Sequence, residues 1–197
     1  MEYIDKINQY FRPLVQKYGN NVKSVDWGNR EKQYLRFKIL CEIANLNGSS
    51  VLDVGCGLAD LYFYFKQSAF DVKYYGIDIV PEMIEQAKKN YPDANLALRN
   101  IINEPFSDEF DYAIASGIIF LGNLELADKI FKSIYHSVRK GFAINSLSAY
   151  VGNVDISSSL EFFPRPQELL DIAFGLSNKI VMRHEYLPYD FTIYLYK

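Results

Sequence analysis

Apolar residues recur at helical spacing through the first part of the chain. Residues 1–18 place aromatic and aliphatic side chains on one face, which predicts an amphipathic helix that ends at Gly19-Asn20-Asn21. A second helix is predicted from about Arg30 to Ala44, with Asn29 as its N-cap. Its buried stripe is expected to consist of Leu35, Ile39 and Ile43.

From residue 50 the pattern changes to short apolar runs that alternate with helical segments. The expected strands are 51–54, 74–78, 95–99, 112–116 and 142–147. The expected helices are 59–67, 81–90 and 123–139, and Gly141 is expected to stop the last of them. Alternation of this kind predicts a parallel sheet with right-handed crossovers and helices on both faces.

The end of the chain follows a different pattern. Two strand-like runs, 180–186 and 191–196, are joined only by Leu187-Pro188-Tyr189-Asp190. A connection this short cannot form a parallel crossover, so the two runs must pair as an antiparallel hairpin. We therefore expect an α/β protein with a mostly parallel, seven-stranded sheet that ends in an antiparallel hairpin strand.

Composition and charge exclude several classes of partner. The net charge is −3 and no dense run of Lys or Arg occurs, so a nucleic-acid partner is not expected. The two cysteines, Cys41 and Cys56, have neither the spacing of a zinc site nor that of a disulfide framework. We therefore expect no metal site and a protein located in the cytoplasm. No stretch approaches the roughly 20 apolar residues of a membrane span, and the charged N-terminus differs from a signal peptide. No membrane partner is expected.

The candidate chemistry lies in a glycine turn that follows the first predicted strand. Asp53-Val54-Gly55-Cys56-Gly57 provides glycines whose backbone a ligand can approach closely. Asp78 ends the next predicted strand, 23 residues after Gly55 (78 − 55). A carboxylate at that offset can accept hydrogen bonds from both ribose hydroxyls of a nucleoside. The turn and the acid together indicate a nucleoside site.

The residues around the turn distinguish between nucleosides. A dinucleotide site usually has a third glycine, but here the turn continues as Leu58-Ala59-Asp60. Asp53 and Asp60 flank the turn, and these carboxylates would repel a pyrophosphate and favour a ligand with sulfonium and ammonium groups. The electrostatics therefore favour S-adenosylmethionine (SAM) over NAD.

Three segments resemble the motif series of class I SAM-dependent methyltransferases. They read VLDVGCGLA at 51–59, GIDIVPEMIEQA at 76–87 and FDYAIASG at 110–117. The resemblance covers roughly residues 35–147, and the terminal hairpin is similar to the family's reversed last strand. It implies a Rossmann-like three-layer sandwich in a single domain, residues 1–197. Residues 1–47 would cover the cofactor and substrate site, and residues 48–197 would form the core.

The resemblance also implies a role for each matching residue. The methionine part of SAM would be bordered by Asp53, Gly55, Cys56, Gly57, Ser116 and Gly117. The ribose and adenine would be bound by Asp78, Ile79, Met83, Asn100 and Ile101. Asn100 stands where many members carry an aspartate that meets the adenine amino group. Arg36 could reach the SAM carboxylate.

Several of these assignments have structural alternatives. Asp53 could be only a cap for the turn, Met83 a core residue and Arg36 a solvated side chain. His184, in the sixth predicted strand, is a weak candidate for a general base and is more readily interpreted as a structural histidine. The aromatic stripe of residues 1–18 could serve packing, substrate binding or both.

The expected reaction is in-line transfer of the SAM methyl group to a small-molecule acceptor, with S-adenosylhomocysteine (SAH) as product. Positioning of the two reactants can supply about 7–11 kcal/mol of the barrier, so no dedicated catalytic residue is required. Substrate selection is assigned to the N-terminal helices and to residues 145–166, which contain Asn145, Ser146, Tyr150, Phe162 and Phe163. The alternatives are an RNA or protein methyltransferase, a non-catalytic SAM-binding protein and an NAD-dependent oxidoreductase.

Overall fold

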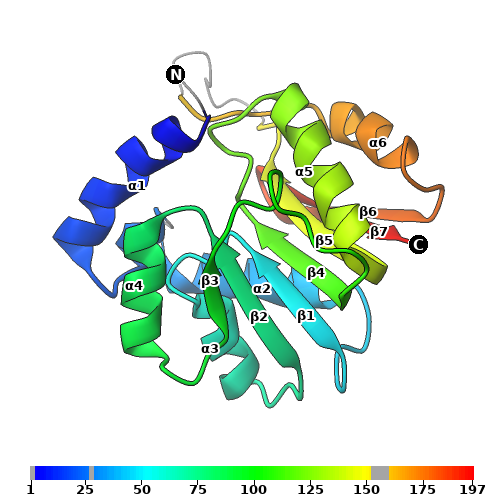
Figure 1. The fold of residues 1–197 in the computed structure, drawn as a ribbon. Coiled ribbons are helices and arrows are strands. Elements are labelled where there is room, and N and C mark those ends of the chain that lie inside the picture. Colours follow the sequence, from blue (N-terminus) through cyan, green and yellow to red (C-terminus); the bar gives the residue numbers. More distant parts are fainter. Residues whose placement is uncertain (1–2, 27–28, 152–159) are drawn as a thin grey trace.

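The computed structural model describes residues 3–26, 29–151 and 160–197, and within them the chain forms a seven-stranded sheet (Figure 1). The strand order is β3-β2-β1-β4-β5-β7-β6. The strands of the parallel part are β1 (Ser50–Val54), β2 (Lys73–Asp78), β3 (Leu96–Leu98), β4 (Phe110–Ser116) and β5 (Val138–Leu147). The five strands predicted for this region are confirmed, with ends that shift by a few residues.

The last two strands form the predicted hairpin. β6 (Ile180–Leu187) pairs antiparallel with β7 (Asp190–Tyr196), and β7 pairs antiparallel with β5. β7 is therefore inserted between β5 and β6 and runs against the parallel strands. The predicted fold class, a mostly parallel Rossmann-like sheet with a reversed C-terminal strand, is confirmed.

Helices cover both faces of the sheet, because the strand side chains that point to each face are mostly apolar. Leu52 and Val54 of β1 belong to one buried cluster and Val51 to another. The first face is covered by α5 (Leu124–Ser137) and α6 (Pro166–Phe174), and the second by α2 (Arg30–Cys41), α3 (Asp60–Gln67) and α4 (Pro81–Asn90). This alternation buries the central strands from both sides, as is usual for parallel sheets.

The N-terminal helix α1 (Tyr3–Tyr18) lies outside these two layers. In Figure 1 the arrowheads of β1, β2 and β4 point towards it. Its buried residues Ile7 and Val15 pack with Leu58, Val80 and Met83, which follow the carboxyl ends of β1 and β2. A 3-10 turn, η1 (Val22–Val25), joins it to α2. The helix therefore lies across the edge of the sheet where parallel α/β folds bind their ligands.

The structure corrects the prediction at the end of α5. The helix ends at Ser137 and β5 begins at Val138, so Gly141 lies inside the strand and does not stop the helix. A Cβ at Gly141 would lie 2.5 Å from the carbonyl oxygen of Leu195 in β7. Gly141 therefore allows the backbones of β5 and β7 to approach each other closely, which is a usual reason for a glycine inside a strand.

Further differences concern the helices. α2 ends at Cys41 and not at Ala44. Leu35 is only half-buried, because the helix turns Gln33, Arg36 and Phe37 inward. Helix α6 was not expected. Residues 152–159 of the predicted substrate segment lie outside the described residues. Among the residues described, no helix combines the length and the apolar character needed to cross a bilayer.

Candidate functional site

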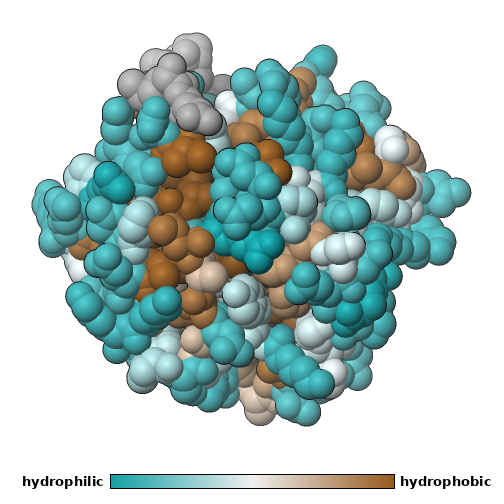
Figure 2. All heavy atoms as spheres, viewed as in Figure 1, coloured by the Kyte–Doolittle hydropathy of each residue, from teal (hydrophilic) through white to brown (hydrophobic). Residues whose placement is uncertain are grey.

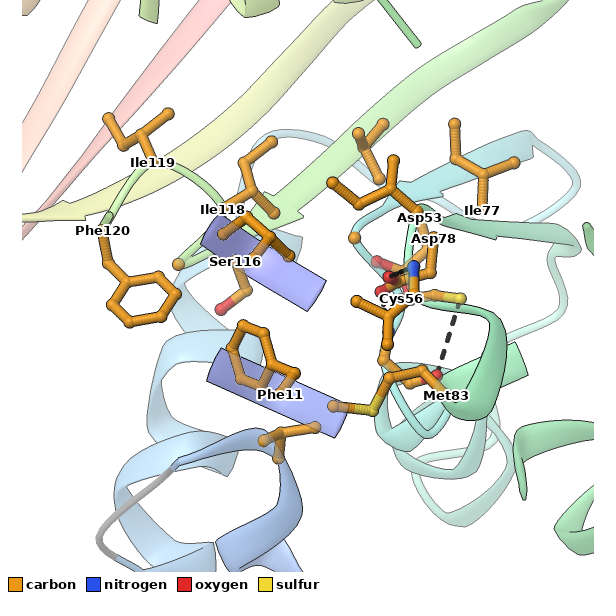
Figure 3. Close-up of a pocket in the computed structure, with 18 of the residues that line it drawn as sticks. Phe11, Asp53, Cys56, Ile77, Asp78, Met83, Ser116, Ile118, Ile119 and Phe120 are labelled. Atoms are coloured by element: carbon orange, nitrogen blue, oxygen red, sulfur yellow. Dashed lines mark hydrogen bonds between the residues drawn. The ribbon is translucent and has the colours of Figure 1, made fainter. Parts of the chain in front are cut away.

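A cavity opens at the carboxyl ends of β1, β2 and β4, beneath α1 (Figure 3). The predicted cofactor residues that line it are Asp53, Gly55, Cys56, Gly57, Asp78, Ile79, Met83, Asn100, Ile101, Ser116 and Gly117. They come from four separate segments of the sequence, and the topology of the sheet brings these segments to one edge. Arg36 and His184 are not among the lining residues.

The glycine turn is held against the neighbouring strand by backbone hydrogen bonds. The amides of Gly55 and Cys56 both donate to the carbonyl of Ile77, at 2.8 and 2.9 Å. Gly55 has a φ of +74°, and a Cβ there would overlap the Cγ2 of Ile118. Gly57 has a φ of +52°, and a Cβ there would lie 2.9 Å from Val25. Both glycines are therefore required by conformation and by space.

Asp78 lies at the end of β2 and binds the backbone of the turn. Its carboxylate accepts hydrogen bonds from the Gly57 amide at 2.8 Å and from the Val80 amide at 2.9 Å. Burial raises the pKa of Asp78, and these backbone hydrogen bonds act in the opposite direction. The carboxylate thus joins the glycine turn to the start of α4 at the place predicted for ribose binding.

Asp53 lies beneath the turn and is 4% exposed. The Tyr74 hydroxyl donates a hydrogen bond of 2.7 Å to its carboxylate. Burial raises the pKa of Asp53 to about 7; the Tyr74 bond lowers it, and the charges of Asp78 and Asp60 raise it. A carboxyl that ionises near neutral pH beneath a ligand cavity is a candidate functional group.

The second flanking acid, Asp60, is buried and already paired. Arg30 donates to one carboxylate oxygen at 2.5 Å, and Gln33 donates to the other at 2.9 Å. Both partners belong to α2, so Asp60 joins the N-terminal helices to the start of α3. The acid that the sequence placed beside the turn is confirmed in position, and its charge is largely compensated by Arg30.

Apolar side chains form the wall on the Asp78 side. Met83 is 2% exposed and packs with Ile7 and Leu58. It also lines the cavity, so it is both a core residue and part of the cavity wall. The side-chain oxygen of Asn100 accepts a hydrogen bond of 2.9 Å from the Ile102 amide. Asn100 therefore uses its side-chain oxygen to shape its own loop, at the position where many family members carry an aspartate.

The opposite end of the cavity is aromatic. Phe11 and Tyr10 of α1 pack edge to face with Phe120, with centroid distances of 5.6 and 5.5 Å. The Tyr3 hydroxyl donates to the Ile118 carbonyl at 2.7 Å, and burial raises the pKa of Tyr3, with a further contribution from Asp78. Figure 2 shows an apolar, hollowed strip beside α1 at this end. The aromatic stripe of α1 therefore both packs and lines the cavity.

Arg36 is engaged in another interaction, which corrects its assignment. Its Nε and Nη2 donate to the two carboxylate oxygens of Asp190 at 2.9 and 2.6 Å, and both side chains are buried. The bidentate pair joins α2 to the start of β7. Arg36 is thus neither solvated nor placed to reach a ligand carboxylate; Asp190, its partner, lines the cavity.

His184 is also placed away from the cavity. It lies in the edge strand β6, where its Nε2 is 2.8 Å from the Ser148 hydroxyl and its ring packs against Tyr150 and Phe191. The structure gives no support to the general-base hypothesis for His184, because the residue does not line the cavity and β7 lies between β6 and the rest of the sheet. The structural interpretation of this histidine agrees with its contacts.

The cavity contains residues that the sequence did not reveal as site residues. Among them are Asp26, Arg99, Ile118, Ile119, Phe120 and Asp190, and also Gln33 and Glu161, which lie in segments assigned to substrate selection but were not named. Ile118 to Phe120 directly follow the predicted Gly117, so extending the motif past its last glycine would have found them. Gln33 lies on the buried face of α2, which the apolar pattern alone could not reveal. Within the substrate segment, Asn145 and Ser146 line the cavity, whereas the Tyr150 hydroxyl bonds Gln167.

Comparison with known proteins adds an independent observation. Residues 45–159 match a family model described as a methyltransferase domain. A Mycobacterium tuberculosis protein named as a methyltransferase is 28% identical over 156 residues, 75% of this chain and 93% of that protein. A Bacillus cereus protein named as an RNA methyltransferase is 34% identical over 91 residues, 46% of this chain but 18% of that protein.

The fold also has close structural neighbours. The crystal structure of the magnesium protoporphyrin IX methyltransferase from Synechocystis, with SAH bound, superimposes with a TM-score of 0.73 at 14% identity. The match covers 98% of this chain and 99% of that one. At this level of identity the likeness establishes the fold.

Proposed function

Because this chain belongs to the methyltransferase domain family and is a SAM-dependent methyltransferase, we propose that its methyl acceptor is a small molecule. The family and the cofactor define the reaction class. The acceptor is a separate question, since relatives of this chain include a protein named as an RNA methyltransferase. The proposal therefore rests on the shape and charge of the cavity.

The residues of the cavity fit SAM. Gly55 and Gly57 provide a surface without side chains, and an added Cβ at either position would strike a neighbouring side chain. Asp78 offers a buried carboxylate to the ribose hydroxyls, and Ile79 and Met83 offer an apolar surface to the adenine. Asp53 provides a negative charge or a proton beneath the turn, which suits a cationic ligand better than a pyrophosphate. We assign these residues to the cofactor on that basis.

When bound, SAM supplies a methyl group made electrophilic by its sulfonium. The side chains of the cavity then hold the two reactants in line and exclude water, which is the main contribution that a methyl transfer requires of the protein. The rings of Phe11 and Phe120 and the side chain of Ile118, which lies against Gly55, add apolar surface to the cavity. No described histidine lines the cavity, so the acceptor is expected to arrive deprotonated or to lose its proton to a carboxylate or water.

The charge of the cavity wall is the observation that carries the proposal. Among the described lining residues the acids are Asp26, Asp53, Asp60, Asp78, Glu161 and Asp190. Asp60 and Asp190 are paired with Arg30 and Arg36, so the acidic character of the wall rests on the other four. Arg99 is the one Lys or Arg among the described residues that line it. A nucleic-acid acceptor brings phosphates, which usually require a basic surface. An acidic cavity with an aromatic end suits a small acceptor with an apolar body.

The proposal is tested by following a labelled methyl group. The protein is incubated with methyl-labelled SAM and, separately, with small-metabolite, RNA and protein fractions of a cell extract. We expect label to enter a product in the small-metabolite fraction. Transfer into RNA or protein alone would contradict the proposal, and SAM binding without any transfer would favour the non-catalytic alternative. A Gly55→Ala variant serves as the inactive control.

We also propose that the protein acts in the cytoplasm. Both cysteines are free and buried, and neither contributes to a disulfide among the described residues. This is the usual state of cysteines in a reducing compartment. Localisation of a tagged full chain by fractionation tests this proposal, and recovery outside the cytoplasmic fraction would contradict it.

A further inference from the structure

Three buried polar atoms of residues that line the cavity have no hydrogen-bond partner. They are the hydroxyl oxygens of Ser116 and Ser146 and the side-chain nitrogen of Asn145. All three residues line the cavity, and Asn145 is 1% exposed. Buried polar groups nearly always find a partner, because leaving water without one is unfavourable. Atoms of this kind in the same cavity therefore point to a ligand that completes their bonding.

The unpartnered atoms of Ser116 and Asn145 belong to neighbouring strands at the same level of the sheet. Ser116 of β4 is in register with Asn145 of β5. Partners in register on parallel strands direct their side chains to the same face. The side chains of Ser116 and Asn145 therefore lie next to each other at the carboxyl ends of their strands.

The chemistry of Asn145 is fixed by its other hydrogen bond. The Gly117 amide donates to the side-chain oxygen of Asn145 at 2.7 Å. Since a backbone amide only donates, the atom that faces it must be the oxygen, and the unpartnered atom must be the nitrogen. That nitrogen is a donor only, so its missing partner is an acceptor atom.

Ser116 was predicted to border the methionine part of SAM, but its hydroxyl is directed away from Asp53 and Asp78. Figure 3 shows the Ser116 hydroxyl directed towards the rings of Phe11 and Phe120, with Asp53 and Asp78 on the other side. A ligand that meets Ser116 thus places its remaining surface against aromatic and aliphatic side chains. The hydroxyl can donate or accept, so it is compatible with the acceptor atom that Asn145 requires.

We propose that Ser116 and Asn145 form a hydrogen-bonding subsite for an uncharged, oxygen-bearing group of the methyl acceptor, whose apolar part packs on Phe11 and Phe120. An ammonium group can only donate hydrogen bonds, so it cannot pair with the side-chain nitrogen of Asn145, which also only donates. A phosphate is disfavoured by Asp26 and Glu161, which line the same cavity. The subsite rests on the proposed function, because it names the class of the small-molecule acceptor.

The matched variants follow from the hydrogen bonds. Asn145→Asp keeps the oxygen that holds Gly117 and replaces the donor nitrogen by an acceptor. Ser116→Ala removes an atom that has no partner, so its melting temperature should be equal to or higher than that of the wild type. The control is Asn90→Asp in α4. It removes another unpartnered nitrogen, keeps the oxygen that Gln86 bonds, and lies away from the cavity.

The experiment uses the full chain saturated with SAH and two fluorinated probes of similar size, followed by fluorine NMR. The oxygen of 4-fluoroacetophenone only accepts hydrogen bonds, and the ammonium of 4-fluorobenzylamine only donates them. We expect the ketone to bind the wild type and the Asn90→Asp control more tightly than the amine. Asn145→Asp should weaken the ketone about tenfold and favour the amine, and Ser116→Ala should weaken the ketone about threefold or more.

Three results would overturn the subsite: tighter binding of the amine to the wild type, no binding of the ketone, or unchanged ketone affinity in Asn145→Asp. A loss of SAH affinity in the variants, with ketone binding retained, would assign the donors to the carboxylate of the cofactor and also overturn it. None of these outcomes bears on methyl transfer itself, which the labelling experiment measures. Failure of the subsite and failure of the proposed function are therefore distinguishable.

Discussion

The buried carboxyl of Asp53 should make the stability of this protein depend on pH in a predictable direction. Its pKa rises from 3.8 to about 7 in the folded chain, mainly through burial. A folded-state pKa above the unfolded one means that the folded protein holds the proton more tightly. The contribution of Asp53 to stability is therefore complete below pH 4, declines as the pH rises from about 4 to about 7, and is constant above that.

The magnitude follows from the size of the shift. A shift of about three pH units at about 1.4 kcal/mol each corresponds to about 4 kcal/mol of lost stability above pH 7. Asp53→Asn abolishes this loss, because an amide oxygen can still accept the Tyr74 hydrogen bond and carries no charge. The free energy of unfolding of the variant, minus that of the wild type, should rise by up to about 4 kcal/mol between pH 4 and pH 8.

The assay is urea unfolding followed by circular dichroism at a series of pH values. The neighbouring Asp78, whose pKa is also raised, is present in both proteins, so the difference between them reports mainly on Asp53. Tyr74→Phe provides a second comparison, since losing the hydroxyl raises the pKa of Asp53 further; the decline still begins near pH 4 but extends to higher pH. A difference that stays constant between pH 4 and pH 8, or that shrinks with pH, would show that the pKa of Asp53 is not raised by folding.

Three other substitutions test the framework of the site. Arg36→Leu leaves Asp190 as an uncompensated buried charge and should lower the free energy of unfolding by about 3–5 kcal/mol; an effect below about 1 kcal/mol in denaturant titration would mean that the pair is not buried in solution. Gly55→Ala forces an ordinary residue into positive φ against Ile118, so we expect a loss of about 1–2 kcal/mol or more together with weaker SAM binding in calorimetry. Asp78→Ala deprives two backbone amides of their acceptor and should lower the melting temperature as well as SAM affinity, whereas a change in affinity alone would show that these hydrogen bonds contribute little.

The sequence predicts the sheet well because periodicity and chain length constrain it. The short connection from Leu187 to Asp190 allows nothing but a hairpin, and the alternation before it requires parallel crossovers. Gly141 illustrates where this reasoning fails. A glycine after a helical stretch and a glycine that admits a neighbouring strand are identical in the sequence, and only the packing of β7 against β5 separates them.

The site is predicted in part for a related reason. Asp53, Gly55 and Asp78 are fixed by local motifs at the ends of consecutive strands, and the structure brings them together. Arg36 and His184 were assigned by side-chain chemistry alone. Their partners, Asp190 and Ser148, are 154 and 36 residues away in sequence. No local pattern encodes contacts of that range, so their roles could be found only in the folded chain.

The acid-flanked glycine turn is expected to bind a cationic methyl donor and not a dinucleotide. Calorimetric titration of the full chain with SAM, SAH and NAD measures this claim, with Asp78→Asn as the matched variant because it retains one acceptor oxygen for the backbone. We predict that SAM and SAH bind, that NAD does not, and that Asp78→Asn weakens SAM binding by about tenfold or more. Binding of NAD, or an unchanged SAM affinity in Asp78→Asn, would contradict the account.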